Sequence, residues 1–430
     1  MSNKETRMSK NDKQQAIVPR LRFPEFRETG KWAEQKLSEV LTEHGLKSTG
    51  GEEVFSVSVH KGLVDQIEHL GRSYSADKTD HYNRVLPGDI VYTKSPTGDF
   101  PLGVIKQSQA NCQVIVSPLY GVFTPESISV GRLIDAYFSS PYNAKTFLAP
   151  IVNKGAKNTI NVTNAAFLSK NLLLPRTKEE QQKIADCLGS LDDLIAAEGR
   201  KLAALRDHKE GLMQQLFPRE GETCPRLRFP EFRNSGDWKA RKINNVLTKK
   251  AESATLDDNG VYREIGVRSH GKGLFHKEPI TGKALGAKRV FHVVPDALVI
   301  NIVFAWEQAL AVTTRNEAGF IASHRFPMFV AKANRCDVAF MQRLFLTPIG
   351  KHLLRVASPG GAGRNRTLNQ KEFEKLDVVI PSPAEQQRIA DCFSTLDVLI
   401  AAQAEKLDAL RTHKRGLMQQ LFPSLEDAEA

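Results

Sequence analysis

Hydrophobic residues after Pro175 recur three and four positions apart, the spacing that places side chains on one face of an α-helix. The same spacing returns after Pro381. Both stretches end at a Leu-Phe-Pro, at Pro218 and Pro423, where proline cannot continue a helix. We therefore predict two long helices of about 38 residues each, roughly 57 Å long at 1.5 Å per residue.

The alternation of three and four is a heptad pattern, which is typical of helices that pair with one another. Because both helices have the same pattern over the same length, we expect them to pair; packing of each helix onto the chain's own globular parts is the alternative. The residues expected at this interface are Ile184, Leu188, Leu191, Ile195, Leu202, Leu205, Ile389, Phe393, Leu396, Ile400, Leu407 and Leu410.

The direction of the pair also follows from the pattern. If a globular domain precedes each helix and the two domains lie at opposite ends, the chain must reverse between copies, so we predict antiparallel helices about a pseudo-twofold axis. Four polar residues interrupt the hydrophobic pattern, and polar residues at such positions can specify register. We expect Glu198 opposite Lys414 and Lys209 opposite Gln403.

The chain is an internal duplication. Residues 180–218 match residues 385–423 at 28 of 39 positions, and residues 19–41 match residues 225–247 at 14 of 23 positions. The sequences enclosed by these blocks, residues 42–170 and 248–375, show almost no running identity. A repeated frame with two divergent inserts indicates a protein that presents two different surfaces.

Each insert contains short runs rich in β-branched and aromatic residues, punctuated by glycine and proline, which predict strands. The predicted fold class is α+β: two globular mixed α/β domains separated by two long antiparallel helices that form a coiled-coil spacer. The predicted organisation is a flexible N-terminal segment at 1–18, a first domain at 19–175, a first helix at 176–218, a second domain at 219–381, a second helix at 382–423 and a C-terminal tail at 424–430.

The formal net charge of +11 favours polyanionic partners. Residues 42–170 have twelve basic and eleven acidic residues, whereas residues 248–375 have twenty basic and eleven acidic residues. We therefore expect the second insert to give the steeper salt dependence of DNA binding. Its DNA-binding candidates include Arg268, Lys272, Lys288 and Arg289.

A loop rich in glycine, asparagine and cations precedes each long helix. Glycine lets a backbone approach a phosphate, and cationic or amide side chains can bond phosphate oxygens or base edges; a solvated turn is the alternative. Both loops contain Thr-apolar-Asn, which suggests that Thr159–Asn161 and Thr367–Asn369 are equivalent. The candidates are Lys154, Lys157, Asn158, Thr159, Asn161, Arg364, Asn365, Arg366, Thr367 and Asn369.

Enzymatic signatures are missing from the sequence. It has no GxxxxGK[ST] nucleotide loop, no [DN]PP[YF] motif and no HExxH, so we expect no catalytic residue and no metal site. The five cysteines form no CxxC pair, which favours reduced thiols. Neither a signal peptide nor an apolar run of the roughly 18 to 20 residues that a bilayer requires is evident, so we expect a cytoplasmic protein without a membrane partner.

The tracts LPRTKEEQQKIADCLGSLDDLI from Leu174 and IPSPAEQQRIADCFSTLDVLI from Ile380, with RLRFPEFR before Trp32 and Trp238, resemble the specificity subunit of a type I restriction-modification system. The resemblance implies that each insert is a target recognition domain that reads half of a bipartite, asymmetric site in double-stranded DNA. It also implies that the helices set the spacer and dock two methyltransferase (M) subunits, and that restriction (R) subunits join the complex. S-adenosylmethionine, ATP and Mg would then bind the partners, and no cofactor would bind this chain.

Two other classes of protein are compatible with a repeat of this kind. A free-standing repressor would use a symmetric homodimer, whereas the two inserts here differ within one chain. A non-catalytic coiled-coil scaffold would use the helices without binding DNA. Filter binding to random-sequence DNA at low salt separates the scaffold from a DNA-binding protein.

Overall fold

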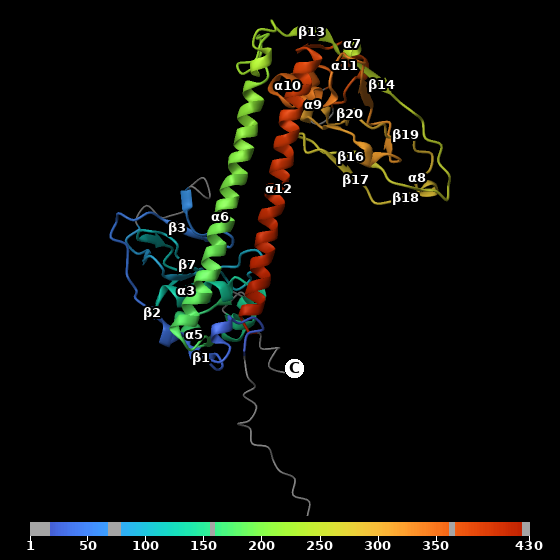
Figure 1. Ribbon diagram of the computed structural model, residues 1–430. Coiled ribbons are helices and arrows are strands. Elements are labelled where there is room, and N and C mark those ends of the chain that lie inside the picture. Colours follow the sequence, from blue (N-terminus) through green and yellow to red (C-terminus); the bar gives the residue numbers. More distant parts are fainter. Residues whose placement is uncertain (1–17, 68–78, 155–159, 361–365, 424–430) are drawn as a thin grey trace, which may run out of the picture. The chain divides into compact units, whose positions relative to one another are not determined.

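The computed structural model describes residues 18–67, 79–154, 160–360 and 366–423. The chain divides into two compact units, one formed by Met1–Gly199 with Lys406–Ala430 and the other by Arg200–Glu405. The two predicted helices are present as α6 (Lys178–Gln215) and α12 (Pro383–Leu421) (Figure 1). Each long helix begins in one unit and ends in the other, so neither helix belongs to a single unit.

The first unit is built on a four-stranded antiparallel sheet with the strand order β2-β9-β6-β7. Four further antiparallel strand pairs and several helices complete it. The sheet strands are β2 (Leu41–Glu43), β9 (Gly121–Pro125), β6 (Ile90–Tyr92) and β7 (Ile105–Gln107). The paired strands are β1 (Ala33–Lys36) with β12 (Asn171–Leu174), β3 (Phe55–Ser58) with β4 (Gly62–Asp65), β5 (Asn83–Val85) with β8 (Val114–Val116), and β10 (Asn153–Lys154) with β11 (Ile160–Asn161). The helices are η1 (Pro24–Phe26), α1 (Leu37–Val40), α3 (Ile128–Phe138), α4 (Pro141–Leu148), η2 (Ala149–Ile151) and α5 (Asn164–Leu168).

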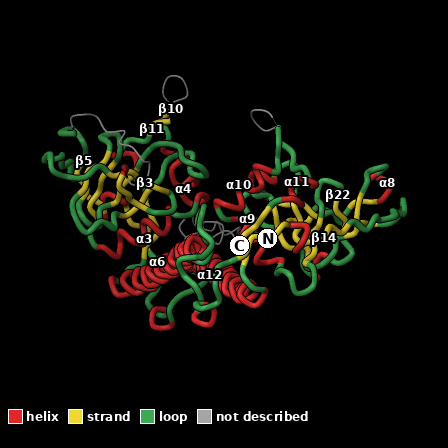
Figure 2. Tube along the Cα trace, turned by 90° about the horizontal axis from the view of Figure 1, so that it is seen from above, coloured by secondary structure: helices red, strands yellow, loops and turns green. Residues whose placement is uncertain are grey.

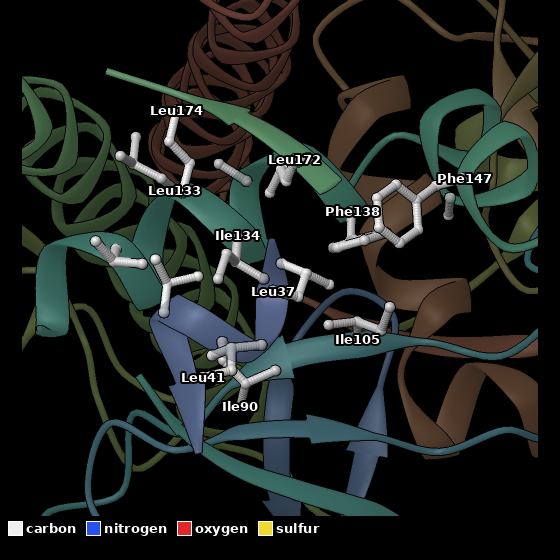
Figure 3. Packing of buried hydrophobic residues seen from close by; sticks show 14 of the residues in the cluster. Leu37, Leu41, Ile90, Ile105, Leu133, Ile134, Phe138, Phe147, Leu172 and Leu174 are labelled. Atoms are coloured by element: carbon white, nitrogen blue, oxygen red, sulfur yellow. The ribbon is translucent and has the colours of Figure 1, made fainter. Parts of the chain in front are cut away.

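The core of the first unit lies between this sheet and the helices (Figure 3). Ile90 of the sheet, Ile134 and Phe138 of α3 and Leu37 of α1 are all at most 1% exposed. Each such side chain contributes about 1.5 to 3 kcal/mol when it leaves water. The insert therefore packs directly on the frame, because α1 and β12, which supplies buried Leu172 and Leu174, belong to the frame blocks.

The second unit repeats this topology with the strand order β14-β23-β20-β21. The matching order shows that the two inserts share a fold. The sheet strands are β14 (Leu247–Lys250), β23 (Met328–Ala331), β20 (Ala297–Ile300) and β21 (Leu310–Val312). The paired strands are β13 (Lys239–Lys242) with β24 (Asp377–Ile380), β15 (Val261–Tyr262) with β18 (Ile280–Thr281), β16 (Ile265–Val267) with β17 (Leu274–His276), and β19 (Val290–His292) with β22 (Ile321–Ser323). The helices are η4 (Pro230–Phe232), α7 (Ile243–Val246), α8 (Gly282–Leu285), η5 (Ala305–Glu307), η6 (Arg315–Glu317), α9 (Val338–Leu346), α10 (Pro348–Val356) and α11 (Gln370–Lys375).

A buried ion pair joins the two blocks of the first frame. Arg22 donates from Nε to Oε1 of Glu180 and from Nη2 to Oε2, both at 2.7 Å, and Trp32 donates to the same carboxylate at 3.2 Å. The Glu180 side chain is only 1% exposed. The second frame has the same arrangement, with Arg228 and Trp238 on Glu385. In each repeat, the two matching sequence blocks thus meet at this ion pair, which fixes the long helix to its domain. We call this Arg–Glu–Trp arrangement the tether.

Within each unit the two long helices run antiparallel. In the first unit, Lys414 donates to Asp192 at 2.5 Å and Lys406 pairs with Glu198, so residue numbers rise on one helix as they fall on the other. In the second unit, Lys209 donates to Asp397 at 2.5 Å. These last two residues are the repeat equivalents of Lys414 and Asp192, so both units use the same pair of positions to join the helices.

The predicted helix register is wrong. Glu198 pairs with Lys406 and not with Lys414, and Lys209 pairs with Asp397 and not with Gln403. The partners of the two lysines are aspartates that lie beside the hydrophobic positions, outside the heptad pattern itself. The sequence pattern could not rank these registers, because it shows which face of a helix is apolar and not which turn of the other helix lies opposite.

The twelve predicted interface residues are all buried or half-buried. At the start of α6, Ile184 and Leu188 join the core of the first unit, and Leu421 at the end of α12 joins the same core. Ile389 and Phe393 do likewise in the second unit, together with Leu216. The helix ends therefore pack against the domains as well as against each other, which combines the two arrangements considered from the sequence.

A double-mutant cycle can verify the register. Replacing Asp192 and Lys414 by alanine, singly and together, is expected to give a coupling of about 0.3 to 1 kcal/mol in urea unfolding, the usual range for a solvent-accessible ion pair. The matched cycle between Glu198 and Lys414 should give a value near zero, because these residues are not partners. A larger coupling in the second cycle would contradict the observed register.

Candidate nucleic-acid interface

The predicted DNA-binding loop of the first unit lies only partly in the described structure. Asn153–Lys154 and Ile160–Asn161 form the short antiparallel pair β10–β11 (Figure 2). Lys157, Asn158 and Thr159 lie outside the described residues, as do Arg364 and Asn365 of the second unit. Lys154 and Asn161 are therefore placed by their backbone alone.

In the second unit, the residues after the loop enter α11 in a fixed conformation. Leu368 is 3% exposed, and its N–H donates to the carbonyl of Ile302 at 2.8 Å. Thr367 is exposed and Arg366 is half-buried. Asn369 is the N-cap of α11, since its Oδ1 accepts from the N–H groups of Lys371 at 3.0 Å and Glu372 at 3.3 Å. The structure thus assigns Asn369 a folding role.

The predicted equivalence of Thr159–Asn161 with Thr367–Asn369 is wrong by two residues. Thr163, not Asn161, is the N-cap of α5 and accepts from the N–H of Ala166 at 3.1 Å. Thr163 therefore corresponds to Asn369, and buried Val162 corresponds to Leu368. Asn161 and Asn369 share a residue type but not a position, since Asn161 lies in β11 and Asn369 caps α11.

Substitutions at Asn369 and Arg366 distinguish a role in folding from a role in DNA binding. Asn369→Ala is expected to lower the free energy of unfolding by about 1 kcal/mol, because two helix N–H groups lose their acceptor. Arg366→Ala should leave the thermal midpoint nearly unchanged and weaken DNA binding by roughly 1 to 3 kcal/mol if its guanidinium contacts a base edge. Exposed Thr367→Ala is the stability control in thermal unfolding. An unchanged midpoint for Asn369→Ala would contradict the capping role.

Arg289 lies at a concave surface beside α11. Its guanidinium is 5.3 Å from the centre of the Phe291 ring, and both residues line a cavity of about 290 Å³ together with Gln370, the first residue of α11. Lys249, Lys250 and His324 line the same cavity. Cationic groups over an aromatic ring suit stacking with a nucleobase as well as contact with phosphate. The structure therefore brings Arg289 close to the start of α11, where the candidates Arg366 to Asn369 end.

Lys288 is exposed and forms an ion pair with the buried Glu264. It donates to Oε1 of Glu264 at 2.5 Å, and Lys277 reaches Oε2 at 3.2 Å. Burial raises the pKa of the Glu264 carboxyl, but the hydrogen bonds from the two lysines outweigh it and hold that pKa below its ordinary value. Lys288 thus neutralises a buried carboxylate, and its contact with DNA stays a prediction.

Arg268 and Lys272 lie in the turn of the hairpin β16–β17, whose two strands are seen side by side in Figure 1. The Arg268 guanidinium lies 4.9 Å from the centre of the Phe275 ring and donates to the carbonyl of Leu274 at 3.0 Å, which fixes its direction. Lys272 is exposed. Gly271, with φ +64°, has a side chain of Leu346 where a Cβ would lie, so this tight turn depends on glycine.

The two units carry opposite charge at one equivalent position. In the first unit Asn164 donates to Glu43 at 2.6 Å, and in the second unit Lys249 donates to Gln370 at 2.5 Å. Both bonds join the first strand of the sheet to the start of the helix after the loop. The two inserts thus keep a hydrogen bond at this position while the residue on the first strand changes from acidic to basic, in line with the charge difference between the inserts.

Catalytic and metal-binding clusters are not apparent in the described residues. No group of three or more His, Cys, Asp or Glu side chains there could hold a metal ion. Burial raises the pKa of the Cys336 thiol to about 12, so it is not a nucleophile near neutral pH. No helix in the described part of the chain is long and apolar enough to cross a lipid bilayer.

The chain is similar to known proteins in sequence and in structure. A family model described as type I restriction modification DNA specificity domain matches residues 236–412. A curated relative from Methanocaldococcus jannaschii, named putative type I restriction enzyme MjaX specificity subunit, is 21% identical over 290 residues, which cover 63% of this chain and 63% of the relative. The chain thus spans less than two thirds of that relative's length. The crystal structure of a type I restriction-modification system S subunit from M. genitalium has a TM-score of 0.56 at 11% identity, covering 95% of this chain and 100% of that chain.

Proposed function

We propose that this chain belongs to the type I restriction-modification specificity family and is the DNA-recognition subunit of such a system. Each unit reads one half of a bipartite, asymmetric site in double-stranded DNA. The observation that carries this proposal is the repeated frame, with its Arg–Glu–Trp tether, holding two inserts of one fold and different surface charge. Such a chain can present two reading surfaces that differ from one another.

The long helices fit a role in spacing and docking. They are tied to each domain through a buried ion pair, and their pairing is fixed by ion pairs in both units. We propose that they set the number of unspecified base pairs and dock two methyltransferase subunits, with restriction subunits joining the complex. Exposed Leu194 and Leu399, which are repeat equivalents, offer one apolar side chain on each helix for a partner.

The chain itself is proposed to be non-catalytic. S-adenosylmethionine, ATP and Mg²⁺ would bind the partner subunits, which supply the chemistry of methylation and cleavage. Within this chain, the candidates for DNA contact are Arg289, which lines a concave surface, Arg268 and Lys272, which are exposed in a hairpin turn, and Arg366, which is half-buried shortly before α11.

Mapping of methylated bases in the genome, with the gene present and deleted, tests the proposal. We expect one bipartite, asymmetric motif to lose methylation on deletion and to regain it on re-expression. Retention of every methylated motif after deletion would contradict the function. Filter binding to random duplex DNA at low salt is the companion measurement, since a scaffold without DNA affinity would not bind.

A further inference from the structure

A basic pocket with a volume of about 630 Å³ lies within the second unit. Strand β13, the end of α7, the loop after β23 and the first residues of α12 form its walls. Figure 1 shows β13 and α7 at the end of this unit where α12 begins. The lining contains five cationic side chains and one carboxylate, Asp237. This surface contains none of the residues considered above as DNA contacts.

Four of the five cations are available to a ligand. Arg228 is held by Glu385 at 2.7 Å. Lys239, Arg241, Lys332 and Arg335 are exposed, and no carboxylate of the described residues forms an ion pair with any of them. Four unneutralised positive charges around one concavity repel each other and are stabilised when an anion binds among them.

The backbone holds these cations in place. Lys239 and Arg241 are two residues apart on β13, opposite Ile380 and Val378, so their side chains project from the same face of the strand. Lys332 and Arg335 flank a tight turn, in which the N–H of Arg335 donates to the carbonyl of Lys332 at 3.0 Å. The turn is fixed to α7, because the N–H of Lys332 donates to the carbonyl of Val246 at 2.8 Å.

The first unit shows that the fold does not need these cations. There, the N–H of Glu126 donates to the carbonyl of Val40 at 2.9 Å, which is the bond that Lys332 makes in the second unit. Ala33 and Gln35 of β1 stand where Lys239 and Arg241 stand on β13. The loop before α9 is also four residues longer than the loop before α3, and Arg335 lies in this extension. The same frame thus folds with an acidic residue in place of Lys332 and with uncharged residues in place of Lys239 and Arg241.

We propose that this pocket binds a phosphate group, with Lys239, Arg241, Lys332 and Arg335 as its ligands. Charge-assisted hydrogen bonds from lysine and arginine are the interactions that proteins commonly use for phosphate oxygens. The N-terminus of α12, whose residues Ser382 and Pro383 line the pocket, adds the positive end of a 39-residue helix. The phosphate could be supplied by a DNA backbone or by a free phosphate compound, which share this chemistry.

Calorimetric titration of the full chain with pyrophosphate, in phosphate-free buffer of low ionic strength, tests the site. The variant Lys239→Ala/Arg241→Gln takes its residues from the first repeat and should keep its thermal midpoint. We expect it to bind pyrophosphate at least about tenfold more weakly than the unmodified chain, since two charge-assisted contacts are lost. Arg335→Ala, which leaves β13 untouched, should also weaken binding.

The matched control is Arg219→Gln/Arg226→Gln, which removes two exposed arginines of the same unit and should bind within about twofold of the unmodified chain. Equal losses in the control and test variants, or no saturable binding by the unmodified chain, would overturn the proposal. Random duplex DNA then identifies the source. If DNA displaces pyrophosphate, the test variant should also lose about 2 from the salt slope of DNA binding, and if not, the ligand is a free phosphate compound. Failure of the methylation test would leave the pyrophosphate result standing, so the two proposals fail separately.

Discussion

Replacing Glu180 by alanine is expected to lower the free energy of unfolding of the first unit by about 3 to 5 kcal/mol. The side chain of its partner Arg22 is 6% exposed, so the substitution leaves a buried guanidinium without its carboxylate. Trp32 loses an acceptor at the same time. Urea unfolding, followed by tryptophan fluorescence and circular dichroism, measures the change.

The neighbouring Glu179 provides the control, because it is exposed on the first turn of the same helix. Glu179→Ala should change the stability by no more than about 0.5 kcal/mol. A second comparison separates the cost of a lone charge from the value of the pair: Arg22→Met/Glu180→Met should be less destabilising than Glu180→Ala alone. Equal effects of Glu179→Ala and Glu180→Ala would refute the structural role of the tether.

Exchange of residues 42–170 for the corresponding insert of a type I restriction-modification specificity subunit is expected to change one half of the methylated motif and leave the other half intact. The insert contains nearly all of its four-stranded sheet. It is held to the frame by a hydrogen bond in which the N–H of Leu37 donates to the carbonyl of Lys170, the last residue of the insert, at 2.8 Å. The frame pair β1–β12 and the Arg22 tether lie outside the exchanged residues. Methylation mapping of the exchanged and unmodified chains gives the answer.

This second experiment depends on the proposed function, and its control is the reciprocal exchange of residues 248–375. That exchange should alter the opposite half of the motif and preserve the half that the first exchange changes. If either exchange altered both halves, the two units would not read DNA independently. A lost motif with unchanged stability would instead indicate that the insert contacts a partner subunit.

Local sequence determined much of the secondary structure. The runs beginning at Val54, Gln113 and Ala297 contain observed strands, because alternating or continuous apolar residues with glycine and proline at their ends restrict the backbone locally. Both long helices begin and end near the prolines that bound them. The duplication could likewise be read directly, and with it the shared fold of the inserts.

The sequence did not predict contacts between residues that lie far apart along the chain. Arg22 and Glu180 were both visible in repeated motifs, and their repetition was a signal that the motifs might meet, but 158 residues separate them. The sequence did not show that Lys288 forms an ion pair with Glu264 or that Asn369 caps α11. The sequence gives the sign of each charge, whereas the residue with which a charged side chain pairs depends on the folded structure.

The sequence by itself determined that two copies of one frame hold two different inserts, that each copy ends in a long amphipathic helix, and that the second insert is the more basic. The tertiary structure alone decided the helix register, where Lys414 meets Asp192, and the gathering of four cations into one pocket. The physical reason is that periodicity fixes the face of an element through its backbone geometry, whereas register and pockets depend on how several elements pack together in space.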